Sequence, residues 1–210
     1  MKTRFILFVT VLICFVSCRE QASKNTEKVP QQEVSKDTVS PKVNAHESEI
    51  KKEIDFTSRL EEKVQRLSKL EHKYQIKNFE KVSPAKTILF GGLQRMIRLR
   101  DTVYKDIDLD MFKNGLHEVS TAFLKGAKPM QPNGNLYPRV TIEEYIFKTP
   151  EIAKTTFNML KKSQKHGSLW MYISKAPHDF FLEENRMYIM ISGGHYMMGI
   201  YKDIAEKIKK

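Results

Sequence analysis

Cysteine is scarce in this chain of 210 residues, and both copies, Cys14 and Cys18, lie close to the N-terminus. Residues 19–210 therefore cannot form a disulfide, a cysteine-based zinc site or a Cys-x-x-Cys redox motif. A folded part of this region must be stabilised by its hydrophobic core alone.

Long apolar runs are also scarce. The run over residues 5–16 is shorter than the roughly 20 residues that a helix needs to cross a bilayer, and no later segment is as apolar. It follows a basic start at Lys2 and Arg4 and leads to Cys18. This order is typical of a secretory signal peptide, which we predict at residues 1–17. A conventionally cleaved secreted protein and an uncleaved N-terminal anchor are the alternatives.

The segment Phe15-Val16-Ser17-Cys18 resembles the lipobox of bacterial lipoproteins, with Phe15 where that family usually has leucine. The resemblance covers the leader only. It implies that Cys18 is the lipidation site, with a diacylglycerol on its sulfur and a third, palmitate-like chain on its amine. Several acyl chains hold a protein on a membrane durably, whereas one chain binds only marginally. The expected location is the bacterial cell envelope, and Arg19, where Asp would indicate inner-membrane retention in enteric bacteria, favours the outer membrane.

Residues 18–47 contain no aromatic side chain and only isolated valines, so we predict a lipidated cysteine followed by a disordered tether. The charges of this tether balance, and loss of the leader lowers the net charge from +11 to +9. The positive charge therefore belongs to residues 48–210 and favours anionic envelope components, or another envelope protein, as partners. The expected location argues against nucleic acid. A lysine-rich surface with no specific ligand is the simpler interpretation.

The spacing of apolar residues predicts an amphipathic helix over 48–75, which either docks on the domain or forms a dimer contact. The predicted globular domain, 76–210, begins with a helical region over 83–126 and continues as β-α-β-β-α over 138–209. The predicted fold class is α+β, with a small, mainly antiparallel sheet and helices on one face. The predicted helices of this domain are 83–104, 109–125, 149–165 and 195–209, and its strands are 140–147, 168–174, 180–182 and 187–191.

Motifs for catalysis or metal binding are lacking. The six histidines are scattered, without a pair at i, i+4 or a His-Glu-x-x-His motif, and no Gly-x-Ser-x-Gly elbow is present. The segment His195-Tyr196-Met197-Met198 contains residue types that ligate haem or copper, but methionines that fill a core are the simpler interpretation. Similarly, Ser192-Gly193-Gly194 is better interpreted as a tight turn than as an anion-binding loop. We therefore predict no catalytic residue, no metal and no cofactor.

These observations favour a lipid-anchored envelope protein that acts as a non-catalytic binding or interaction module. One alternative is a small-ligand carrier or an enzyme, with its site between the sheet and the N-terminal helices. That alternative gains support if His117, His178 and His195 surround one cleft. The other alternative is a dimeric structural lipoprotein joined through residues 48–75.

Overall fold

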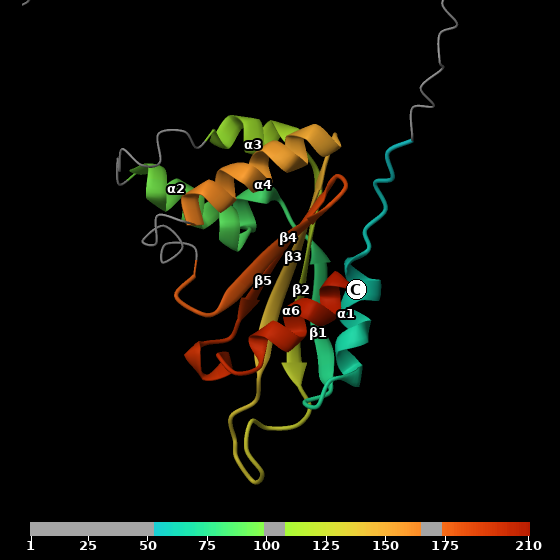
Figure 1. Ribbon diagram of the computed structural model, residues 1–210, viewed down its shortest axis with the longest axis vertical. Coiled ribbons are helices and arrows are strands. Elements are labelled where there is room, and N and C mark those ends of the chain that lie inside the picture. The colour runs from blue at the N-terminus through green and yellow to red at the C-terminus, as the bar shows by residue number, and fades with distance from the viewer. Residues whose placement is uncertain (1–52, 99–107, 165–173) are drawn as a thin grey trace, which may run out of the picture. The chain divides into compact units, whose positions relative to one another are not determined.

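A five-stranded antiparallel sheet is the centre of the computed structural model, which describes residues 53–98, 108–164 and 174–210 (Figure 1). The strand order is β1-β2-β3-β5-β4, so β1 and β4 are the edge strands. This arrangement confirms the predicted α+β class and its antiparallel sheet. The strands are β1 (Tyr74–Lys81), β2 (Leu116–Gly126), β3 (Arg139–Phe147), β4 (His178–Glu183) and β5 (Arg186–Ser192).

Residues 50–210 form one compact unit. The predicted signal peptide, Cys18 and the predicted tether lie outside the described residues, as does most of the predicted strand 168–174. Within the described part of the chain, no helix is long and apolar enough to cross a membrane. The helices are α1 (Leu60–Gln65), η1 (Arg66–Lys69), η2 (Pro84–Lys86), α2 (Ile88–Arg98), α3 (Leu109–Gly115), α4 (Pro150–Gln164), η4 (His195–Met197) and α6 (Tyr201–Lys209).

The prediction of a long helix over 48–75 is wrong, because only 60–69 are helical among its described residues, 53–75. The backbone becomes extended at Leu70 and turns at Lys73, whose φ is +47°, and Tyr74 then begins a strand. Leu60, Val64 and Leu67 are fully buried against the sheet of their own chain. The short helix therefore docks on the domain, and its apolar face is used there.

The predicted helix over 109–125 is also wrong beyond its first two turns. Asp108 caps α3 by accepting a hydrogen bond of 2.7 Å from the backbone N–H of Met111, and the helix ends at Gly115. Residues 116–126 then form the longest strand of the sheet, with β1 on one side and β3 on the other. Hydrogen bonding to two neighbouring strands outweighs the helix-like spacing of the apolar residues, since local propensity is a weak preference.

The C-terminal part of the structure agrees closely with the prediction made from the sequence. The predicted strand at 140–147, the helix that begins near Pro150 and the hairpin of β4 and β5 are all present. The last helix is shorter than predicted, because η4 and a turn occupy residues 195–200 before α6 begins. The region predicted as helix 83–104 contains η2 and α2 in its described part.

Helices cover both faces of the sheet, which corrects the prediction of a single covered face. Figure 1 shows α2, α3 and α4 on one side and α1 and α6 on the other. Each group contributes to its own apolar cluster: the first contains Phe112, Tyr145 and Ile189, the second Leu60, Ile142 and Met190. The central strands β3 and β5 are buried along almost their whole length, as expected for strands packed on both faces.

Candidate functional site

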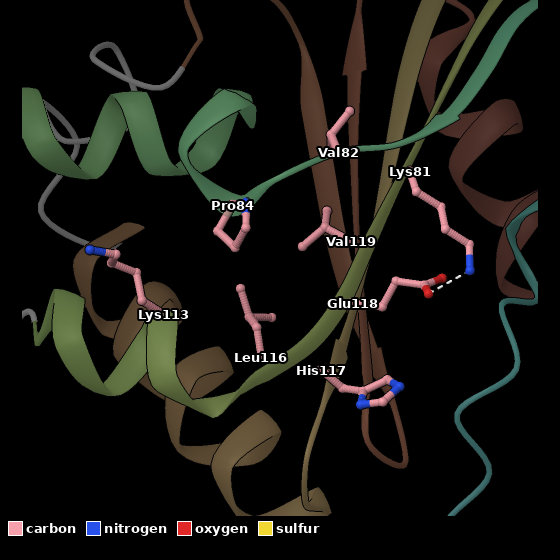
Figure 2. A pocket seen from close by; sticks show the side chains of 8 residues that line it. All are labelled: Lys81, Val82, Pro84, Lys113, Leu116, His117, Glu118 and Val119. Carbon is pink, nitrogen blue, oxygen red and sulfur yellow. Dashed lines mark hydrogen bonds and ion pairs between the residues drawn. The ribbon is translucent and has the colours of Figure 1, made fainter.

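A surface pocket lies where β1 ends beside the start of β2. It has a volume of about 250 Å³ and is lined by Lys81, Val82, Pro84, Lys113, Leu116, His117, Glu118 and Val119. We call it the bulge pocket. Figure 2 shows its apolar side chains in the middle, with Lys113 on one side and Lys81, Glu118 and His117 on the other.

A β-bulge builds one wall of this pocket. The register of β2 against β3 shifts between Leu116 and Glu118, so His117 is the extra residue of the bulge. A bulge breaks the regular alternation of a strand and redirects a side chain, and bulges are frequent beside functional sites. The opposite wall forms because the chain after Lys81 stays on the sheet for one more bond, from Val82 N to Val119 O at 2.9 Å. Pro84 then begins η2 and closes that side.

The rim of the bulge pocket carries two lysines and one glutamate. Lys81 Nζ lies 2.6 Å from Glu118 Oε2, so this pair is nearly neutral. Lys113 Nζ lies 5.7 Å from the centre of the Phe90 ring, which supports a lysine by a cation–π contact. The His117 ring packs against Phe56, with ring centroids 4.3 Å apart. The pocket therefore presents an apolar floor and more positive than negative groups.

The histidines that sequence analysis named do not meet in one cleft. Of the three, only His117 lines the bulge pocket. His178 begins the edge strand β4, which β3 and β5 separate from β2, and its Nδ1 lies 3.1 Å from the carbonyl oxygen of Ala176. His195 begins η4. In the described ranges, no group of three His, Cys, Asp or Glu side chains is placed to hold a metal ion.

The two other motifs have structural roles. Met197 is fully buried and its Sδ accepts hydrogen bonds from the backbone N–H groups of Arg139 and Gly193, whereas Met198 is 59% exposed. The Gly193 N–H also donates to the carbonyl oxygen of Arg139 at 2.7 Å, so it is not free to bind an anion. Met197 therefore fills the core, and the Gly193 N–H serves the local fold.

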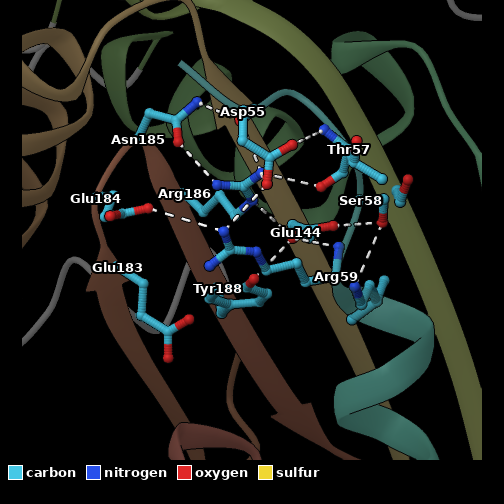
Figure 3. A network of polar contacts seen from close by, with 12 residues as sticks. Asp55, Thr57, Ser58, Arg59, Glu144, Glu183, Glu184, Asn185, Arg186 and Tyr188 are labelled. Carbon is cyan, nitrogen blue, oxygen red and sulfur yellow. Dashed lines mark hydrogen bonds and ion pairs between the residues drawn. The ribbon is translucent and has the colours of Figure 1, made fainter. Parts of the chain in front are cut away.

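A buried polar network lies on the face of the sheet that α1 covers (Figure 3). Glu144 and Arg186 are both 0% exposed, with Arg186 Nε 3.7 Å from Glu144 Oε1. The guanidinium group donates to the carbonyl oxygens of Asp55 (2.7 Å) and Thr57 (2.9 Å) and forms an ion pair with the Asp55 carboxylate at 3.0 Å. We call this set, with Ser58 and Tyr188, the Arg186 network.

Glu144 completes the Arg186 network. Its carboxylate accepts hydrogen bonds from the hydroxyls of Ser58 (2.5 Å) and Tyr188 (2.7 Å) and from the backbone N–H of Arg59 (3.1 Å). Burial, and then the charge of Glu144, raise the pKa of Tyr188, so this phenol stays a hydrogen-bond donor. All of these groups are occupied in holding residues 55–59 on the sheet.

The adjacent Glu143 points to the opposite face of the sheet. It accepts a hydrogen bond from the backbone N–H of Ile88 at 3.0 Å, at the start of α2, and one from the Tyr145 hydroxyl. Burial raises the pKa of Glu143. Sequence reasoning missed these two acids, although adjacent glutamates inside an otherwise apolar strand were a visible signal, because buried charges need partners.

Comparisons with protein-family models, curated proteins and solved structures give no significant match for this chain.

Proposed function

We propose that this protein is a lipid-anchored component of the bacterial envelope and a non-catalytic binding module, with the bulge pocket as its ligand site. The observation that carries the site is its lining. Lys113 stands beyond the paired Lys81 and Glu118, with His117 at the rim, around a floor of Val82, Pro84, Leu116 and Val119. Such a lining fits an anionic group, for example a phosphate or carboxylate, attached to an apolar or sugar framework.

The chemistry of the lining favours binding over catalysis. Its one carboxylate, Glu118, is already paired with Lys81, and the lining contains no serine, threonine or cysteine that could act as a nucleophile. The buried polar contacts around Arg186 and Glu143 serve the fold. The net charge of +9 over residues 48–210 adds long-range attraction for acidic envelope components.

A thermal-shift screen against anionic glycans and lipopolysaccharide fragments tests the binding site. A ligand that binds only the folded state raises the melting temperature. We expect Lys113→Glu to weaken binding of a ligand identified in this screen about tenfold, because the substitution reverses one charge of the rim. Lys154→Glu, on the exposed face of α4, is the matched control and should bind as wild type does. Equal weakening by both variants would point to unspecific attraction and against the pocket.

The lipid anchor has its own test, which is incorporation of radiolabelled palmitate into wild type and Cys18→Ala. We expect the wild type to be labelled and the variant to remain unlabelled and be released from the membrane fraction. Equal labelling of the two proteins would refute lipidation at Cys18 and leave the bulge pocket as a separate question.

A further inference from the structure

A second, smaller pocket lies at the opposite end of β1 from the bulge pocket. It is formed where η1 turns into β1 against the first turn of α6, and its volume is about 40 Å³. We call it the corner pocket. The eight residues of β1 place it roughly 23 Å of strand away from the bulge pocket, so it is independent of the function proposed above. Its lining includes Leu70, Glu71, His72, Tyr74, Asp203 and Ile204.

Two buried polar atoms of the corner pocket lack a partner among the described residues. His72 is 8% exposed and Tyr74 is 3% exposed, yet His72 Nδ1 and the Tyr74 hydroxyl make no hydrogen bond there. Their rings meet edge to face, with centroids 6.4 Å apart. Buried polar side-chain atoms nearly always have a partner, so two unpartnered atoms lining one cavity point to a group that occupies it.

Backbone contacts position both residues at this corner. The carbonyl oxygen of His72 accepts hydrogen bonds from the N–H groups of Ala127 (2.9 Å) and Lys128 (3.2 Å). Tyr74 is the first residue of β1 and pairs with Gly126 on β2. These contacts fix the backbone that carries the two side chains, and both residues are buried.

The charge of the corner pocket is opposite to that of the domain. Glu71 and Asp203 stand exposed at its mouth, and no lysine or arginine is part of its lining, although residues 48–210 carry a net charge of +9. Burial raises the pKa of Tyr74, with the nearby Tyr196 and Asp203 adding to the effect, so the hydroxyl stays neutral. A neutral imidazole nitrogen and a phenol oxygen can both accept hydrogen bonds.

We propose that the corner pocket binds a primary ammonium group. Two carboxylates at the mouth attract a positive charge, and His72 Nδ1 and the Tyr74 oxygen accept its N–H bonds inside. The same carboxylates repel an anion. A cavity of this size holds only a few heavy atoms, and the described side chains offer no three-ligand metal cluster. A free small amine and the ammonium end of an aminolipid headgroup share this chemistry.

Thermal unfolding of residues 19–210 in salts of matched concentration tests the proposal, since both apolar clusters lie within residues 60–208 of this chain. We expect methylammonium and ethanolamine chloride to raise the melting temperature in a saturable way, which calorimetric titration then confirms as binding. Sodium chloride and tetramethylammonium chloride should not raise the melting temperature in this way, because neither cation has an N–H group to donate. An equal response to all four salts would overturn the proposal and leave water as the occupant of the pocket.

Two pairs of variants locate the binding. Tyr74→Phe removes only the hydroxyl, and Asp203→Asn removes one charge of the mouth, and each should weaken methylammonium binding about tenfold. Glu206→Gln, also exposed on α6, is the control for Asp203→Asn, and Tyr137→Phe is the control for Tyr74→Phe. Unchanged affinity in both test variants would refute the assignment to this pocket. Vesicles of phosphatidylethanolamine, compared with phosphatidylcholine, then show whether a headgroup or a free amine is bound.

Discussion

At the scale of single residues, Arg186 joins the sheet to the beginning of the domain, because its guanidinium contacts reach the backbone of Asp55 and Thr57. We expect Arg186→Met to lower the free energy of unfolding by about 3–5 kcal/mol, since it leaves Glu144 buried without its cation. Arg66→Met is the control, because its partner Glu62 is exposed and such pairs contribute at most about 1 kcal/mol. Urea titration measures both values, and similar losses in the two variants would contradict the role of Arg186.

Asp55 makes the stability of the domain depend on pH in the acidic range. Hydrogen bonding from the Thr57 backbone, and then from Arg59, lowers the pKa of Asp55 from 3.8 to about 2 in the folded state. A lowered pKa means that the stabilisation is fully present above pH 3.8 and is lost as the pH falls towards 2. Unfolding measured between pH 4 and 2 should therefore depend more steeply on pH in wild type than in Asp55→Asn. Parallel curves would show that Asp55 is unpaired in solution.

At the scale of elements, we expect the same substitution at two glycines to change the stability in opposite directions. A Cβ on Gly115 would lie 2.5 Å from Ile152 Cγ2, so Gly115→Ala should force α3 away from α4 and cost about 1–3 kcal/mol. A Cβ on Gly91 in α2 would meet nothing within 4 Å, and Gly91→Ala should stabilise the protein by about 0.5–1 kcal/mol. Differential scanning calorimetry should show one melting temperature fall and the other rise, and a shift in the same direction would contradict this packing.

The elements also show how much of the fold could be predicted from the sequence. The strand 139–147, α4 and the β4–β5 hairpin were predictable because turn residues bound them and their apolar patterns are unambiguous. The region 116–126 was not, since Leu116, Val119 and Phe123 fit a helix as well as a strand. The choice depends on β1 and β3, which are distant in sequence. The bulge at His117 could not be predicted either, because a register shift depends on how two strands pair.

At the scale of the whole molecule, the sheet is buried on both faces, and this changes where the domain begins. The second face is covered by α1 and α6, which come from the two ends of the described chain. The segment before β1 is therefore part of the core and not an appendage, and the Arg186 network extends this requirement to Asp55. The first described segment is thus held to the sheet by the ion pair between the partly exposed Asp55 and the buried Arg186.

Truncation tests this boundary. A chain that begins at Ile50 should unfold at the same urea midpoint as one that begins at Arg19, because both apolar clusters and the Arg186 network are kept. A chain that begins at Leu60 loses Asp55 and Thr57, which contact Arg186, and Ser58, which donates a hydrogen bond to Glu144. It should be several kcal/mol less stable. If this loss acts through the network, Arg186→Met must cost less in the Leu60 chain than in the Ile50 chain, since coupled sites are not additive. Additive losses would mean that residues 50–59 stabilise the domain by other contacts.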